Sequence, residues 1–173
     1  NRKEARAAYF AYENTGLAAQ GNKSESARYL DMTGEWKFNF VKNHNEAPEG
    51  FFAVGYDDSA WSTFPVPGLF EILGYGDRIY RNAGYPWNLQ FEPNPPYIEE
   101  RNNYTGSYRK SFMIPADWKG QQVYLHVGSA TSNLMVWVNG KYVGYSEDAK
   151  MAAEFDITPY LVPGKENLVA MQV

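Results

Sequence analysis

The chain has 173 residues, of which 44% are hydrophobic and 21% are charged, and its formal net charge is −4. This composition is that of a globular chain with enough residues for one core, and it excludes an intrinsically disordered protein. The basic residues are scattered, so we expect no nucleic-acid partner, and no apolar run is long enough to span a membrane. The absence of cysteine excludes disulfides and thiolate metal sites.

The first 30 residues are mixed in character. Residues 4–12 fit a short helix, but Asn14-Thr15-Gly16 is expected to end it, so we interpret residues 1–30 as an extended N-terminal arm. Residues 31–173 are expected to form the folded domain. Its first strand is indicated by Trp36, Phe38 and Phe40, which alternate with polar residues.

The middle of the chain is less regular. Residues 57–61 suggest a turn or a single helical turn, and the prolines in residues 64–68 restrict that segment to an edge or irregular strand. Residues 68–104 are rich in Gly, Pro, Tyr and Asn and form a predicted long loop. A loop of this length in a compact domain is usually functional or packed against another element.

Strand patterns resume at Gly106. One predicted strand has Tyr108, Lys110, Phe112 and Ile114 on one face. The next has Val123, Leu125 and Val127 on its apolar face, which places His126 on the polar side.

The clearest local signal is Asn139-Gly140 between alternating apolar residues, which predicts a two-residue type I′ hairpin. The predicted opposing pairs are Trp137 with Tyr142, Val136 with Val143, and Leu134 with Tyr145.

An acidic stretch follows the hairpin, with carboxylates at Glu147, Asp148, Glu154 and Asp156. A short strand at 155–157 and one helical turn at 158–161 come next. Strands thus recur about every 10–15 residues without long helices, which predicts an all-β fold, a β-sandwich of jelly-roll type.

The residues alone suggest little chemistry. Two histidines without cysteine make a transition-metal site improbable, and no phosphate loop or nucleophile elbow is present. The four carboxylates fit a solvated loop at least as well as a glycosidase pair. Composition and pattern therefore lead to a β-sandwich domain and no further.

Three segments resemble the N-terminal domain of bacterial β-galactosidases of glycoside hydrolase family 2. They are LDMTGEWKF (30–38), GYGDRIYRNAGYP (74–86) and the region 136–161, which contains VWVNGKYVGYSED (136–148). The resemblance implies a galactose-binding-domain-like jelly roll that packs against a TIM-barrel domain of the same chain. The acid/base and nucleophile glutamates of such retaining enzymes lie downstream, so this chain is expected to hold no catalytic residue and to be inactive alone.

The resemblance also implies substrate-binding roles for Asn82 and Asp148, and it makes Asp148 a candidate sodium ligand. Magnesium and sodium are expected cofactors of the full-length enzyme, with none in this piece. A carboxylate both accepts hydrogen bonds from sugar hydroxyls and binds hard cations, and an amide donates and accepts. The family often has Arg and Pro near residues 150–152. This chain has neither, which leaves the rigidity of its loop open.

Other readings remain. β-Glucuronidases and β-mannosidases resemble the hairpin but match Ser146-Glu147-Asp148 less well. A stand-alone carbohydrate-binding module is an alternative, as is a scaffold whose segments 1–30 and 68–104 make interdomain or subunit contacts. The full-length protein is expected to be a homo-oligomer.

The ends of the sequence suggest a longer protein. It begins at Asn1 and stops inside the strand-like run 168–173, so we expect it to be the first piece of a soluble bacterial enzyme. Periplasm and cytoplasm both fit.

Overall fold

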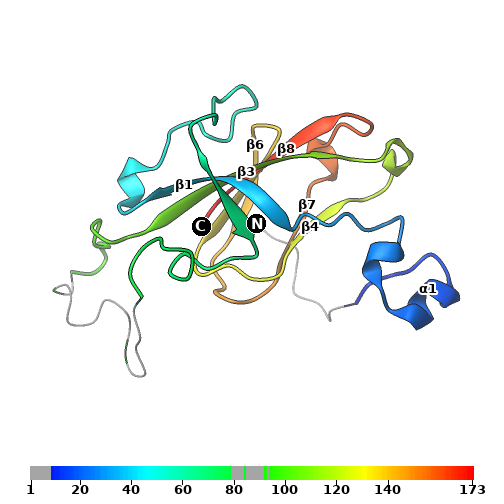
Figure 1. Ribbon diagram of the computed structural model, residues 1–173, viewed down its shortest axis with the longest axis horizontal. Coiled ribbons are helices and arrows are strands. Elements are labelled where there is room, and N and C mark those ends of the chain that lie inside the picture. The colour runs from blue at the N-terminus through cyan, green and yellow to red at the C-terminus, as the bar shows by residue number, and fades with distance from the viewer. Residues whose placement is uncertain (1–8, 79–83, 85–91, 93) are drawn as a thin grey trace.

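The computed structural model describes residues 9–78, 84, 92 and 94–173, which form a nearly all-β domain (Figure 1). This confirms the predicted jelly-roll β-sandwich. The strands are β1 (Gly34–Val41), β2 (Ser62–Val66), β3 (Thr105–Met113), β4 (Tyr124–Val127), β5 (Leu134–Val138), β6 (Lys141–Ser146), β7 (Ala153–Asp156) and β8 (Glu166–Gln172). The helical segments are α1 (Thr15–Gln20) and the 3₁₀ turns η1 (Lys23–Glu25), η2 (His44–Glu46), η3 (Ala116–Trp118) and η4 (Thr158–Tyr160).

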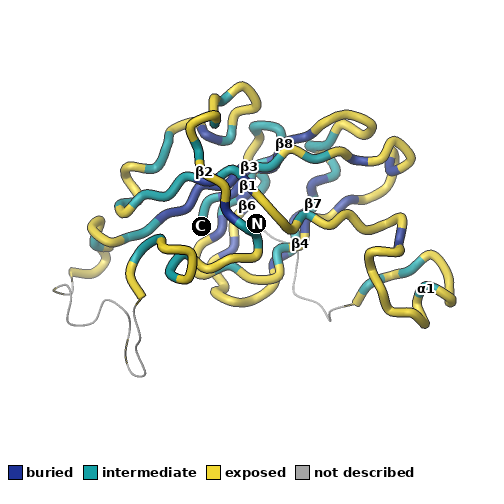
Figure 2. The backbone as a smooth tube through the Cα atoms, viewed as in Figure 1, coloured by how far each residue is buried: buried dark blue, intermediate teal, exposed yellow. Residues whose placement is uncertain are grey.

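The strands form two antiparallel sheets. One has the order β2-β1-β3-β8-β5-β6, and the other pairs β4 with β7. The core lies between them; alternate residues are buried in β5 and β7, while β3 and β8 each have five consecutive buried residues (Figure 2). We call the side of the six-stranded sheet that faces this core its core face, and the opposite side its outer face. No helix among the described residues is long and apolar enough to cross a membrane.

Aromatic rings fill one end of the core. Phe38 lies with its ring centroid 4.4 Å from that of Phe64 and 4.8 Å from that of Tyr108. Phe70 and Tyr75 extend this cluster, at 5.7 and 4.9 Å from Phe38. The segment that follows β2 is therefore fixed to the core by two of its own rings.

Most of the predicted strands are confirmed. The segment with two prolines forms the end of β2, at the edge of the large sheet, with Pro65 inside the strand and Pro67 just beyond it. Residues 57–61 form a turn, since the N–H of Trp61 donates to the carbonyl of Asp58 at 3.0 Å. His126 is exposed on β4, as its place in the alternation predicts.

The predicted hairpin register is only partly right. Asn139 and Gly140 have φ of 49° and 79°, as a type I′ turn requires, and Trp137 opposes Tyr142. A bulge then shifts the pairing by one residue, so Val136 opposes Gly144 and Leu134 opposes Ser146. The strict alternation would have carried Tyr145 into the core; the bulge leaves Tyr145 43% exposed and buries Ser146 instead.

The hairpin turn is also a polar junction. The side-chain amide of Asn139 donates to the Oδ1 of Asn167 and to the carbonyl of Tyr160, each at 2.8 Å. Asn167 is 1% exposed and bonds the backbone of Val162 and Lys165. This network connects the hairpin, η4 and β8, which sequence patterns did not indicate.

The N-terminal arm is not extended throughout. Asn14 begins α1 rather than ending a helix, because its side chain accepts a hydrogen bond from the N–H of Leu17 at 2.9 Å, as an N-cap does. In Figure 1, α1 lies apart from the two sheets. The indole of Trp118 donates to the carbonyl of Ala27 at 2.9 Å and connects the arm to the domain. The division at residue 30 stays a prediction.

Candidate functional site

The acidic stretch forms an exposed connection between the two sheets. We call residues 147–152, between β6 and β7, the acidic loop. Asp148 is exposed two residues after the buried Ser146, so it stands on the surface immediately beyond a strand end. A carboxylate in this place can reach a ligand without unfolding the strand.

Backbone hydrogen bonds hold the acidic loop in place. The N–H of Lys150 donates to the carbonyl of Ala130 at 2.9 Å, and the N–H of Met151 donates to that of Asp148 at 3.2 Å. Lys150 has φ of 66°, in the left-handed region that residues other than glycine rarely occupy. The loop therefore has a defined turn without the Arg and Pro that the family resemblance led us to expect.

The four carboxylates of the stretch separate by role. Asp156 accepts a hydrogen bond from the N–H of Thr158 at 3.0 Å, which stabilises the start of η4. The Oε1 of Glu154 lies 3.2 Å from the Nδ1 of His126 on the neighbouring strand. Glu147 and Asp148 are the two exposed in the acidic loop.

The described residues place no cluster of metal-binding side chains around Asp148 for its expected sodium role. Among the residues that the structure describes, no three His, Cys, Asp or Glu side chains come close enough to hold a metal together. An exposed carboxylate fits a hard cation as a single ligand, but such an ion takes several oxygens. The remaining ligands would have to come from backbone carbonyls, substrate, water or another part of the enzyme.

Asn82, the second predicted sugar contact, lies outside the described residues. The segment just before it is described to residue 78. There the hydroxyl of Tyr104 donates to the carboxylate of Asp77, and burial together with this hydrogen bond raises the pKa of Tyr104 to about 12. The pair connects Asp77, within the predicted long loop, to Tyr104 at its end, and its 27-residue separation left no signal in the sequence.

Gly76 shows why the chain turns tightly at this point. Its φ is 68°, and a Cβ added there would come within 2.8 Å of the Tyr104 ring. The glycine thus allows both the left-handed turn and the close approach of the ring.

Comparison with known proteins agrees with this architecture. Residues 29–173 match the family described as glycosyl hydrolases family 2, sugar binding domain. The β-galactosidase of Priestia megaterium (strain DSM 319 / IMG 1521) is 36% identical over 173 residues, covering 100% of this chain and 17% of that protein. That of Halalkalibacterium halodurans is 38% identical over 168 residues, covering 97% of this chain and 16% of its own length.

Solved structures share the fold. A glycosyl hydrolase family 2 member from Bacteroides cellulosilyticus DSM 14838 superposes with a TM-score of 0.59 at 27% identity, over 84% of this chain and 17% of that one. A β-glucuronidase from an uncultured Clostridium species has a TM-score of 0.59 at 20% identity, over 83% of this chain and 21% of its own, which shows the fold alone. The chain spans about a sixth of the length of the two β-galactosidases above. The chain belongs to glycoside hydrolase family 2 and corresponds to its sugar-binding domain.

Proposed function

We propose that this chain is the N-terminal domain of a retaining β-galactosidase and that it supplies Asp148, together with Asn82, to the galactose site. The observation that carries the proposal is the exposed Asp148 on a loop whose turn is fixed by backbone hydrogen bonds. The names of the relatives at 36% and 38% identity support β-galactosides as the substrate class.

The chemistry of the reaction belongs to the rest of the enzyme. Hydrolysis with retention needs a nucleophilic carboxylate and an acid/base carboxylate on opposite sides of the glycosidic bond. Under the proposal both come from a TIM-barrel domain of the same chain. Asp148 accepts a hydrogen bond from a galactose hydroxyl, and so fixes the sugar ring while the bond is broken.

The test is a substitution in the full-length enzyme. Asp148→Asn keeps the shape of the side chain and removes its charge. We expect kcat/KM for a nitrophenyl β-galactoside to fall by roughly 10- to 150-fold, because a hydrogen bond to a charged group contributes about 1.5–3 kcal/mol. Glu147→Gln, the neighbouring exposed carboxylate, is the matched control and should leave kcat/KM unchanged. Equal losses in both variants, or none in either, would remove Asp148 from the site.

Substrate class is tested with the same enzyme. Activity on the nitrophenyl β-galactoside should exceed that on the matching glucuronide and mannoside. A preference for the glucuronide or mannoside would instead favour the alternative enzymes that share this fold.

The cation is a separate part of the proposal. Asp148 would contribute one oxygen to a sodium ion that helps hold the sugar, and magnesium would act elsewhere in the enzyme. Sodium titration of activity should show a weaker apparent affinity in Asp148→Asn than in Glu147→Gln. Identical sodium dependence in the two variants would mean that Asp148 is no ligand.

The isolated 173-residue chain is expected to show no turnover, since both catalytic carboxylates are proposed to lie outside it. Purified chain that hydrolyses lactose would contradict this. Light scattering on the full-length enzyme tests the proposed homo-oligomer.

A further inference from the structure

We propose that a groove on the outer face of the six-stranded sheet binds a pyranose unit of a neutral glycan. The groove has a volume of about 380 Å³, within the range of small-molecule sites. One wall is formed by residues 44–52, and the other by β5 and the end of β8. Asp148 is not among its lining residues.

The apolar part of the groove is a pair of stacked rings. Phe52 and Trp137 lie with their centroids 5.1 Å apart and their planes only 4° from parallel. Phe51 meets Trp137 edge-on at 5.3 Å and supports it from the buried side. Flat, fixed aromatic faces suit the C–H face of a pyranose ring, which is apolar while its edge carries the hydroxyls.

The remaining side chains of the groove are polar. His44, Asn45 and Glu49 come from the loop wall, and Gln172 comes from β8. The two amides both donate and accept hydrogen bonds, and the carboxylate accepts, which matches the dual character of sugar hydroxyls. The lining has one carboxylate, Glu49, and no Lys or Arg, so an anionic ligand such as a phosphate is disfavoured.

A row of polar side chains leads into the sheet from Gln172. Its amide donates to the hydroxyl of Ser107 at 3.3 Å, and Ser107 opposes Asn39 on the next strand. Ser107 is 1% exposed, and the Oδ1 of Asn39 is buried without a hydrogen-bond partner. A buried acceptor left unpaired is uncommon, and a bridging water would satisfy it; neither Asn39 nor Ser107 lines the groove, so of this row only Gln172 can meet a ligand.

The loop wall is preformed. Arg109, which is 4% exposed, reaches out from β3 and donates to the carbonyls of Phe51 and Ala53, the latter at 2.9 Å. Its Nε also donates to the carboxylate of Asp58 at 2.7 Å. A ligand therefore meets a wall that is already ordered, and binding does not require it to be fixed first.

The test is hydrogen–deuterium exchange of the full-length protein with two probes. Isopropyl 1-thio-β-D-galactoside resists hydrolysis, and cellobiose is not a β-galactoside. We expect at least one of them to slow exchange in residues 44–52 and 134–138. No protection of these segments by either sugar up to its solubility limit overturns the proposal.

Variants then assign the protection to the groove. Trp137→Ala should weaken binding at the groove at least tenfold, and Asn45→Ala, an exposed rim position, about threefold. Tyr124→Ala, on β4 of the other sheet, is the matched control and should change nothing. If Trp137→Ala does not fold by circular dichroism, Asn45→Ala decides. Protection that persists undiminished in Asn45→Ala and in folded Trp137→Ala overturns the proposal.

Asp148→Asn separates this inference from the proposed function. Groove protection should persist in that variant even where galactoside hydrolysis is lost. Loss of groove protection in Asp148→Asn would mean that the sugar is held by the acidic loop, and the groove would not be a site of its own.

Discussion

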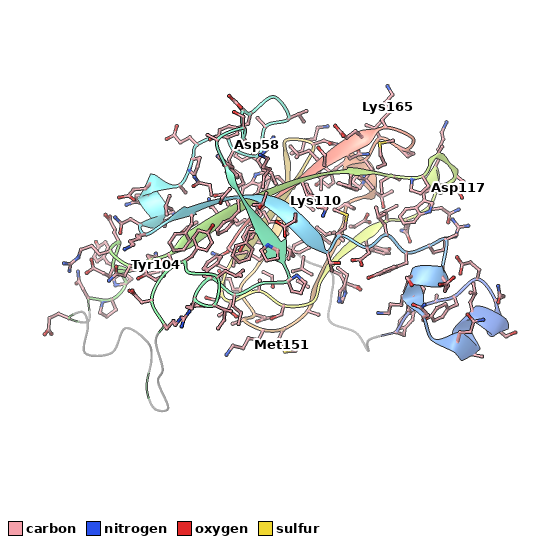
Figure 3. The ribbon with its side chains drawn as sticks, viewed as in Figure 1. Asp58, Tyr104, Lys110, Asp117, Met151 and Lys165 are labelled. Atoms are coloured by element: carbon pink, nitrogen blue, oxygen red, sulfur yellow. The ribbon has the colours of Figure 1, made fainter. Side chains whose placement is uncertain are left out.

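Two loops of this domain are built in opposite ways. The outer-face loop, residues 44–58, is held by a buried arginine that bonds three carbonyls and a carboxylate. The acidic loop, residues 147–152, has backbone hydrogen bonds at Lys150 and Met151 and a strained turn at Lys150. In Figure 3, Asp58 of the first loop and Met151 of the second lie on opposite sides of the sheets. The outer-face loop is thus anchored by a buried side chain, while the carboxylates of the acidic loop are exposed.

The largest effect is expected when the anchored loop loses its anchor. Arg109→Ala removes every one of these hydrogen bonds and leaves the half-buried Asp58 without its partner. The free energy of unfolding should fall by about 2–4 kcal/mol, measured by urea denaturation. Amide hydrogen–deuterium exchange of residues 51–58 should become faster, while that of residues 147–152 should stay unchanged. Arg109→Lys keeps the charge but not the forked guanidinium, so its free energy of unfolding should lie between those of the native protein and Arg109→Ala. Equal acceleration of both loops would show that they are not independent.

The next effect concerns the strands that carry the acidic loop. Asn167→Ala removes the acceptor of the Asn139 amide and of the Val162 N–H, two hydrogen bonds that are partly buried. We expect the free energy of unfolding to fall by about 2–3 kcal/mol, because several partly buried polar groups lose their partner at once. Lys165→Ala on the neighbouring exposed position should be neutral by the same urea titration. A neutral Asn167→Ala would mean that the hairpin is positioned by its apolar contacts alone.

A smaller effect on stability is expected from relieving the backbone strain at Lys150 in the acidic loop. Lys150→Gly places a residue without Cβ at φ of 66° and should raise the free energy of unfolding by about 1 kcal/mol. Ala149→Gly, one residue earlier, should lower it slightly, because it only adds backbone freedom in the unfolded chain. Thermal or urea unfolding of the pair distinguishes them. Destabilisation by both would show that the turn at Lys150 carries no strain.

The smallest effect is a pH dependence in the segment before Asn82. Tyr104 has its pKa raised from 10.0 to about 12 by burial and by Asp77. A raised pKa means that the protonated phenol stabilises the folded chain below pH 10, and that this contribution is lost as the pH rises through about 12. A difference ultraviolet titration of the native chain against Tyr104→Phe should show one missing ionisation near pH 12. A missing ionisation near pH 10 would place Tyr104 in solvent.

The contrast between the loops also shows what a sequence can reveal. The strand alternations and the Asn-Gly turn are local signals, and they predicted most strands and the hairpin. The bulge that turns Tyr145 outward and Ser146 inward was missed, because the strict alternation of the hairpin residues gives no sign of a register shift. Asn14 was misread for a related reason, since a residue that favours turns also caps helices.

The sites divide in the same way. The resemblance led to Asp148, and the structure places it exposed at a strand end, while Asn82 lies outside the described residues. Arg109 and the Asn139–Asn167 pair could not be predicted, because their partners are 28 to 58 residues away in the chain. Such contacts are set by the folded topology, and no spacing in the sequence indicates them.

The most direct test of the proposed role of Asp148 compares hydroxyls one at a time. In the full-length enzyme, kcat/KM is measured for a nitrophenyl β-galactoside and its 2-, 3-, 4- and 6-deoxy analogues, with the native protein, Asp148→Asn and Glu147→Gln. For each hydroxyl, the penalty is the factor by which kcat/KM falls when that hydroxyl is removed from the substrate. If Asp148 accepts a hydrogen bond from one hydroxyl, the penalty for that hydroxyl should be about tenfold or more smaller in Asp148→Asn and should keep its native size in Glu147→Gln. Four penalties that are the same in Asp148→Asn as in the native enzyme would contradict the account.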